Sequence, residues 1–295
     1  MTTVPATAVA DTELLERPLR GTPEDQDDAG RLIAVTVTAA EQLGPNLRRL
    51  TLASPGLREL TLTGPDEFFG LLMPRDRGEF TLFDTAGRNI RAAVAEIGED
   101  ERPGLRWYTV RHFRQEAGEI DVDVVMHDDH PGPGATWVAA AQPGDTAGIW
   151  LANAIWTRHN TDSPLFVADP SAVPALRAVL EFTVDHHPED LKDYHLVIVT
   201  DGGTDLESGF AEEWQDKVAS LTVLNATPEQ ATEAVRTHLT EATAAGHPST
   251  KPGYVWASGE AGMAKAVRGV AVDDWGLDSS VINWVAYWIE GRPRP

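Results

Sequence analysis

The chain has 295 residues, a formal net charge of −22 and no cysteine. Such an acidic protein is not expected to bind nucleic acid, because phosphate binding needs clustered cations. The absence of thiols excludes disulfides, zinc–thiolate sites and cysteine-ligated iron–sulfur clusters. No apolar run approaches the ~18 residues of a membrane span, and the first residues do not form a secretory signal. We therefore expect a cytoplasmic protein of about two domains.

The first half of the chain has the pattern of a β-domain. Residues 1–29 are polar and acidic, which is typical of a disordered tail. Residues 30–155 contain short alternating runs separated by Gly/Pro turns, and these predict an antiparallel β-barrel, for which we expect six strands. The clearest strand is EIDVDVVMH, in which Ile120, Val122 and Val124 share one face and Asp121 and Asp123 the other.

The second half alternates between strands and helices. Strands are predicted at PLFVAD, YHLVIVTD, LTVLNAT, GYVWASG and SVINWVAYW. Helices are predicted at residues 171–187, 229–245 and 260–272. This order favours a parallel, Rossmann-like α/β domain over residues 160–295, with residues 152–163 as the link.

The stretch RWYTVRH contains a guanidinium, a phenol and a hydroxyl within four positions. Side chains two apart on a strand share a face, so Arg106 and Tyr108 should point the same way. A flat aromatic ligand with a phosphate tail would use Tyr108 for stacking, Arg106 for the phosphate and Thr109 for a ring heteroatom. The alternative is a tyrosine packed in the barrel beside a surface arginine.

A Gly/Pro-rich turn precedes the predicted helix at GATWVAAAQ. The free N–H groups at its start, from Gly134 to Trp137, suit an anionic pyrophosphate. His127 and His130 lie three apart before this turn, but no helix or further ligand supports a metal site there.

Together these motifs resemble the siderophore-interacting proteins, which are FAD-dependent ferric-siderophore reductases of the ferredoxin–NADP reductase superfamily. The resemblance extends from about Arg31 to the C-terminus. Its motifs are RWYTVR, IDVDVVMH, GPGATW, AQPGD, SAVPALRAVLE, VWASGEAGMAKAVR and VAYWIEG.

The resemblance implies a set of FAD contacts. Tyr108 would lie against the isoalloxazine, Thr109 near its reactive nitrogen and Arg106 on the pyrophosphate. Further contacts would come from a strand end and a helix start, which comprise Val125, Met126, His127, Gly134, Ala135, Thr136 and Trp137. The chain departs from the family pattern at Gly70, where a lysine is usual, and at Ala135, where a hydroxyl is usual.

The electron donor and the substrate are less closely defined. The candidate nucleotide-binding residues are Asp201, Ser258, Gly259 and Glu260, and the candidate substrate residues are Lys265, Arg268, Trp288 and Arg292. No cation occurs between Asp201 and Lys217, which favours NADH over NADPH. The acidic chain favours neutral or cationic ferric hydroxamates over polyanionic catecholates.

Three functions remain open at this point. The leading one is reduction of a ferric siderophore by NAD(P)H through FAD, with ferredoxin as an alternative donor and without a catalytic acid, base or nucleophile. The second is a general FAD-dependent reductase with another electron acceptor. The third is a flavoprotein that binds a siderophore without turnover.

Overall fold

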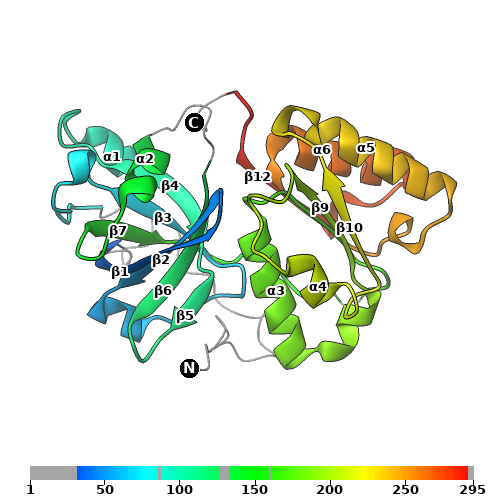
Figure 1. Cartoon of the computed structure of the whole chain (residues 1–295), viewed down its shortest axis with the longest axis horizontal. Coiled ribbons are helices and arrows are strands. Elements are labelled where there is room, and N and C mark those ends of the chain that lie inside the picture. Colours follow the sequence, from blue (N-terminus) through cyan, green and yellow to red (C-terminus); the bar gives the residue numbers. More distant parts are fainter. Residues whose placement is uncertain (1–31, 86–87, 127–132, 160, 292–295) are drawn as a thin grey trace. The chain divides into compact units, whose positions relative to one another are not determined.

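The computed structural model describes residues 32–85, 88–126, 133–159 and 161–291. Within these ranges the chain divides into two compact units (Figure 1). We call residues 32–43 and 47–157 the barrel unit, and residues 44–46 and 158–291 the α/β unit. None of the helices in the described ranges has the length and apolarity needed to cross a bilayer.

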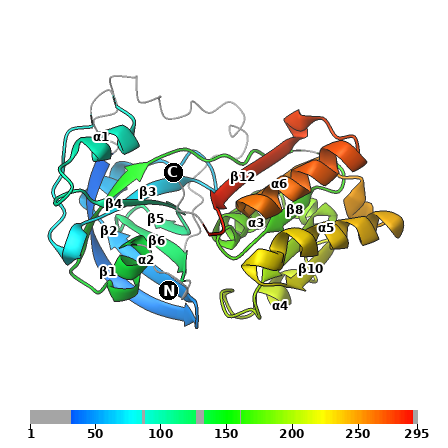
Figure 2. The same ribbon diagram turned by 90° about the horizontal axis from the view of Figure 1, so that it is seen from above.

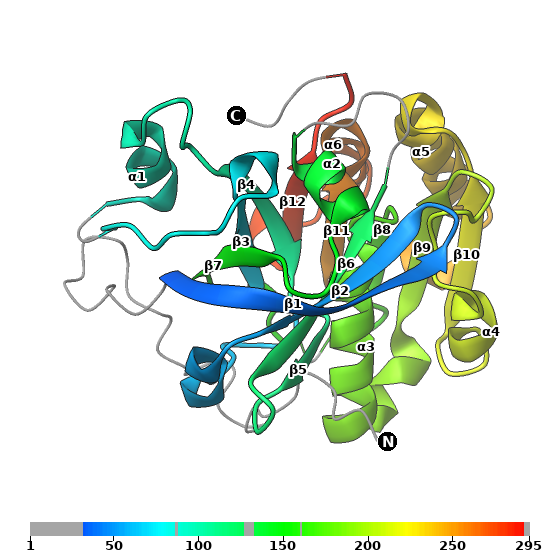
Figure 3. The same ribbon diagram turned by 60° about the vertical axis from the view of Figure 1, so that its left-hand side comes forward.

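The barrel unit is built on one antiparallel sheet (Figure 3). Its strands are β1 (Leu32–Gly44), β2 (Leu47–Ala53), β3 (Phe68–Met73), β4 (Gly104–Thr109), β5 (His112–Arg114), β6 (Glu119–Val125) and β7 (Thr146–Leu151). They follow the order β4-β3-β7-β1-β2-β6-β5. Two helices accompany the sheet, α1 (Ile90–Glu96) and α2 (Pro133–Ala140). The predicted antiparallel barrel is therefore confirmed, whereas α1 was not predicted.

The RWYTVRH stretch closes this sheet into a barrel. Strand β4 pairs with β3 at one end of the strand order, and β5 pairs with β6 at the other. Between them, Val110 N donates to Glu67 O and Arg111 N donates to Asp121 O, both at 2.8 Å. The sheet has seven strands rather than the predicted six, because this segment bends at Val110 and Arg111 to change partners.

Close packing on the barrel sheet is visible at Gly148 in β7. A Cβ added there would lie 2.2 to 2.9 Å from three ring carbons of Phe80. Phe80 belongs to a core cluster that includes Leu72, Ile90 and Trp150. Only a glycine lets the aromatic ring lie directly on the strand backbone. Packing, rather than a turn, therefore requires glycine at position 148.

The α/β unit contains a parallel sheet in the order β10-β9-β8-β11-β12 (Figure 3), of which β8, β10 and β12 are also labelled in Figure 2. Its strands are β8 (Leu165–Ala168), β9 (His195–Thr200), β10 (Ser220–Asn225), β11 (Val255–Glu260) and β12 (Ile282–Trp288). Its helices are α3 (Val173–His186), α4 (Phe210–Trp214), α5 (Pro228–Ala244) and α6 (Ala261–Gly269). The predicted parallel α/β fold is confirmed.

Helices cover both faces of this sheet, with α5 and α6 on one face and α3 and α4 on the other (Figure 1). Val235 and Leu239 of α5 and Met263 and Val267 of α6 are buried in one cluster with side chains of β8, β9 and β11. A parallel sheet buried on both faces explains why these strands read as continuous apolar runs rather than alternating ones.

Candidate functional site

Strand β4 presents Arg106 and Tyr108 on one face of the sheet. Tyr108 lies across from Phe69 and Arg106 across from Leu71, so the two side chains point to the same side. Arg106 is exposed and Tyr108 is half-buried. Burial raises the pKa of Tyr108 to about 12, although the charge of Arg106 opposes the shift. The phenol therefore stays protonated and can donate a hydrogen bond at any physiological pH.

The other face of β4 is occupied differently. Trp107 packs edge-on against Phe68, with ring centroids 5.4 Å apart. Thr109 lies across from Phe68 and is 5 % exposed. The hydroxyl expected near a ligand is thus buried on the face opposite Tyr108, close to the point where the chain leaves β4.

The start of α2 packs against Arg106. A Cβ added at Gly134 would lie 2.9 Å from Arg106 Cγ and 3.2 Å from Met73 Cε. This contact places the N–H groups of the helix start next to a guanidinium, and amides and a guanidinium together suit a pyrophosphate. Trp137 is also buried here, and its Nε1 has no hydrogen-bond partner among the described residues. The residues present therefore fit the phosphate part of a dinucleotide cofactor.

Four of the remaining predicted cofactor residues lie at the end of β6 and in α2. Val125 ends β6 and is half-buried, as is Met126 after it. In α2, Ala135 is half-buried and Thr136 is exposed. His127 lies outside the described residues.

The opposite end of α2 is held by Arg48, which the sequence analysis missed. Its Nη2 donates to Ala141 O at 2.7 Å, and its Nη1 donates to Ala139 O. A cation that binds the last carbonyls of a helix also interacts favourably with the helix dipole. Arg48 therefore fixes the end of the helix whose start faces Arg106.

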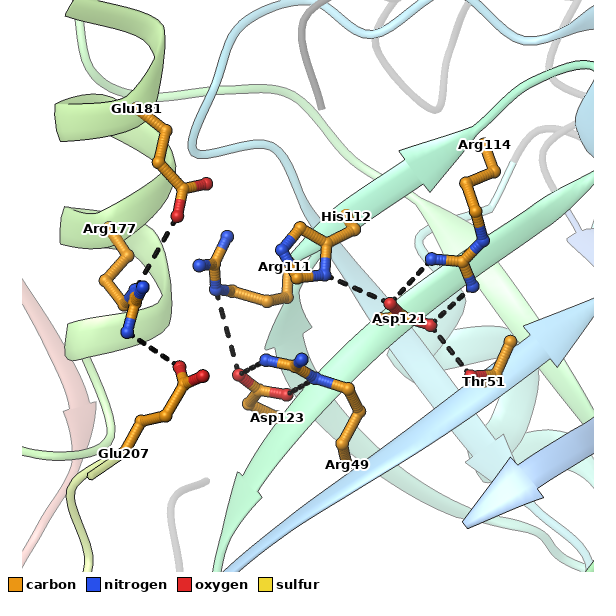
Figure 4. A network of polar contacts seen from close by, with 10 residues as sticks. All are labelled: Arg49, Thr51, Arg111, His112, Arg114, Asp121, Asp123, Arg177, Glu181 and Glu207. Atoms are coloured by element: carbon orange, nitrogen blue, oxygen red, sulfur yellow. Dashed lines mark hydrogen bonds and ion pairs between the residues drawn. The ribbon is translucent and has the colours of Figure 1, made fainter. Parts of the chain in front are cut away.

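The polar face of β6 carries a buried charge network that was also missed (Figure 4). Asp123 and Asp121 are 7 % and 5 % exposed. Arg49 binds both oxygens of Asp123 at 2.6 and 2.7 Å. Arg111, whose side chain is 2 % exposed, lies 3.8 Å from the same carboxylate. The alternating acidic residues of EIDVDVVMH are therefore internal ion-pair partners rather than solvated charges.

Two further buried carboxyls, those of Asp66 and Glu67, directly precede β3. Asp66 accepts from Ile155 N at 3.1 Å and from Trp156 N at 3.0 Å. Glu67 accepts from the hydroxyl of Thr63 at 2.9 Å. Burial raises the pKa of Asp66 to about 6, although the Trp156 and Ile155 amides act in the opposite direction. Asp66 thus fixes the chain just before it leaves the barrel unit.

The second candidate site is the edge of the α/β sheet where the parallel strands end. Ser258, Gly259 and Glu260 form the end of β11, and Glu260 lies across from Trp288 of β12. Ser258 is fully buried, and its hydroxyl has no hydrogen-bond partner among the described residues. Trp288 Nε1 donates to Asp169 Oδ2 at 2.8 Å. The structure therefore brings Trp288, a predicted substrate residue, together with Glu260, a predicted nucleotide residue. Both donate to Asp169, which was not predicted as a site residue.

The other predicted residues of this unit that the structure describes lie in the turn after β9 and in α6. Asp201 is exposed in the turn after β9. In α6, Lys265 is exposed and Arg268 is half-buried. Arg268 is the eighth residue of α6, and at 1.5 Å per residue it lies about 10 Å along the axis from the helix start. Arg292 lies outside the described residues.

An antiparallel barrel followed by a parallel α/β unit is the two-domain fold of the ferredoxin–NADP reductase class. The ferredoxin–NADP⁺ reductase of Plasmodium falciparum shares this fold at a TM-score of 0.58 and 9% identity, with 87% of this chain and 96% of that chain covered.

Two family models then match nearly all of the described chain. Residues 36–153 match the siderophore-interacting FAD-binding domain and residues 161–291 match the siderophore-interacting protein domain. The chain belongs to the siderophore-interacting protein family. Its barrel unit is the FAD-binding domain of that family.

Similar proteins of several bacteria agree with this assignment. The siderophore-interacting protein SipS of Aeromonas hydrophila has a TM-score of 0.68 and 22% identity, with 89% of this chain and 93% of that chain covered. The ferric vibriobactin reductase ViuB of Vibrio cholerae is 30% identical over 160 residues, which are 52% of this chain and 57% of that protein. The mycobactin import protein IrtA of Mycolicibacterium smegmatis is 24% identical over 261 residues, which are 87% of this chain and 26% of that protein. The chain thus spans about a quarter to about a half of these two curated relatives.

Proposed function

We propose that this protein is an FAD-dependent ferric-siderophore reductase that takes electrons from a reduced pyridine nucleotide and releases iron(II) from the siderophore. The observation that carries the proposal is the contact between Arg106 and the start of α2 beside Tyr108. Bound FAD accepts two electrons as a hydride and passes them on singly, which links a two-electron donor to one-electron reduction of iron(III). Each turnover then reduces two ferric complexes to ferrous ones, which their hard oxygen ligands hold less tightly.

The side chains of the barrel unit bind and orient the cofactor in this proposal. Arg106 and the amides from Gly134 to Trp137 hold the pyrophosphate, and Tyr108 packs against the isoalloxazine. Thr109, Val125, Met126 and His127 line the flavin on the basis of the family pattern. The polar network of β6 keeps the β5–β6 end of the barrel rigid while the cofactor is bound.

We propose NADH rather than NADPH as the donor. The loop after β9 is acidic, and the buried Arg177 beside it is already occupied. Arg177 binds Glu207 at 2.7 Å and Glu213 at 2.8 Å, and it lies 3.6 Å from Glu181. A 2′-phosphate needs a free cation, whereas a ribose 2′-hydroxyl suits a carboxylate such as Asp201. Since reduced nucleotide is an intracellular donor, the reaction is cytoplasmic.

We propose a ferric hydroxamate of low negative charge as the substrate. A net charge of −22 repels a polyanionic tris-catecholate. At Gly70, a Cβ would lie 2.7 Å from Leu105 Cδ1 and 3.4 Å from Trp107 Cζ3, so this position is covered by apolar side chains. ViuB is a ferric vibriobactin reductase and IrtA a mycobactin import protein, and a siderophore substrate for this chain agrees with both.

The deciding experiment is anaerobic reduction of the purified holoprotein. We expect flavin absorption that bleaches with NADH, and iron(II) that a ferrous chelator captures when a ferric hydroxamate is added. Bleaching without iron release would favour a reductase with another acceptor. Flavin that neither NADH, NADPH nor reduced ferredoxin bleaches would overturn the reductase proposal in favour of a binding protein.

A further inference from the structure

Asp169, the residue directly after β8, is a buried carboxylate bound by four donors from three segments of the chain. It is 4 % exposed. Ser171 N and Ser171 Oγ donate to its Oδ1 at 2.9 and 2.6 Å. Glu260 N donates to its Oδ2 at 2.6 Å and Trp288 Nε1 at 2.8 Å. The carboxylate therefore connects the ends of β8, β11 and β12.

The backbone of Gly259 lies directly against this carboxylate. Gly259 has a φ of +133°, in a region that only glycine adopts without strain. A Cβ added there would lie 2.4 to 2.6 Å from the carboxyl atoms of Asp169. The pairing of β11 with β12 shifts its register between Gly259 and Glu260, at the same point. The turn that ends β11 is thus shaped around Asp169.

These residues lie at the point where the strand order reverses. From β8 the chain proceeds to β9 and β10 on one side, and later to β11 and β12 on the other side. In open parallel sheets, ligands bind outside the carboxyl ends of the strands at this switch point. Asp169 directly follows β8 and Gly259 is the last residue but one of β11, so both lie at the edge of the sheet where this fold binds ligands.

The donors to Asp169 carry no charge to balance the carboxylate. Its four donors are two amides, a hydroxyl and an indole N–H, none of which is charged. Burial raises the pKa of Asp169, and these hydrogen bonds only partly oppose the shift. A buried carboxyl without a cation costs stability, and a cost of this kind is retained where the position serves function.

We propose that Asp169 is a positioning residue, which holds the indole of Trp288 and the bulge at Gly259 and Glu260 in the geometry that the pyridine nucleotide needs. This inference rests on the proposed function. The hydrogen bond to Nε1 fixes the plane of the indole ring beside the β-bulge of β11, and an indole held in one plane can stack on a flat nicotinamide ring. Asp169 thereby sets nucleotide affinity.

Two single variants and their combination test the inference in the FAD-loaded full chain. Trp288→Phe removes the indole N–H and keeps an aromatic ring. Asp169→Asn keeps one acceptor oxygen. Either the two Ser171 donors or the pair of Glu260 N and Trp288 Nε1 therefore loses its acceptor. Trp284→Phe, on the same strand but 39 % exposed, is the matched control. The readout is the NADH concentration that gives the half-maximal rate of anaerobic flavin reduction, measured with flavin content and thermal midpoint.

We expect each single variant to raise that concentration about tenfold, as loss of one buried hydrogen bond predicts. When the amide nitrogen of the Asp169→Asn variant faces Trp288, the double variant should be no worse than that single variant, because both changes then break the same bond. Flavin content and the Trp284→Phe values should stay at wild-type levels. A structural role alone would lower the thermal midpoint without this non-additive change in nucleotide dependence.

The outcomes separate this inference from the proposed function. Rapid flavin reduction with unchanged nucleotide dependence in Trp288→Phe overturns the positioning role and leaves the reductase intact. Wild-type flavin that no reduced nucleotide bleaches overturns both. If Asp169→Asn fails to fold, Trp288→Phe decides alone, since it leaves the carboxylate in place.

Discussion

Arg114 binds both oxygens of the Asp121 carboxylate, at 2.6 and 2.7 Å, across the pair of strands β5 and β6. His112 Nδ1 lies 3.0 Å from the same carboxylate, and Thr51 Oγ1 donates to it at 2.8 Å. Burial acts against the ionised form, yet the bonds from Arg114, His112 and Thr51 hold the pKa of Asp121 well below its usual range. Asp121 therefore stabilises the fold in its charged state.

Asp121→Asn should lower the free energy of unfolding by about 3 kcal/mol at pH 7, because it removes one member of a buried ion pair. The folded-state pKa lies below the unfolded value of about 3.9, so the contribution is complete above pH 4 and is lost as the pH falls. Urea unfolding at pH 7 and pH 3 measures the difference. Equal destabilisation at both pH values would contradict this origin. Arg88→Met, which breaks the exposed pair with Glu96, is the control and should cost less than about 1 kcal/mol.

Asp66→Asn should have the opposite dependence on pH. The folded-state pKa of Asp66 is raised from 3.8 to about 6, so the folded protein holds its proton more tightly than the unfolded chain. The ionised carboxyl then lowers stability above pH 6 by roughly 3 kcal/mol relative to pH 4. The variant should be more stable than wild type at pH 8 and similar to it at pH 4. A difference that does not grow between these two values would show that Asp66 titrates normally.

Tyr108→Ala and Arg106→Ala should both weaken FAD binding, and Arg106→Ala more strongly. Loss of a charge-assisted hydrogen bond to phosphate corresponds to about 1.5–3 kcal/mol, which is roughly a tenfold to hundredfold rise in the dissociation constant. Fluorescence titration of the apoprotein with FAD measures it. Arg75→Ala is the control, because Arg75 is an exposed arginine of the same unit that donates to Glu99 O. Full flavin retention by both variants would mean that the site lies elsewhere.

Gly148→Ala should destabilise the barrel unit by about 1–3 kcal/mol, since the added methyl group overlaps the ring of Phe80. The same change should cost less in a Phe80→Leu background, where the smaller side chain leaves room. Chemical unfolding of the four proteins of this cycle provides the test. Additive effects would show that the two residues do not share this space.

Local patterns in the sequence were enough to predict both folds, but they could not reveal the buried polar networks. On β6 the alternation placed Asp121 and Asp123 on one face correctly, yet their partners Arg49 and Thr51 lie 74 and 70 positions away. Asp169 was read only as the end of a strand, because its donor Trp288 is 119 positions distant. Such pairings depend on the strand order, which periodicity does not encode. The bend at Val110 was missed for the same reason.

The β4–β5 segment gives the barrel unit an evolutionary constraint. The run from Arg106 to Arg114 carries the proposed flavin contacts and also joins the two ends of the sheet. A substitution in this run that changes flavin binding therefore also affects the pairing that closes the barrel. Substitutions that change flavin affinity during divergence should therefore accumulate in α2 and at Arg48. These positions alter the placement of the helix start beside Arg106 and leave the pairing of β4 and β5 intact.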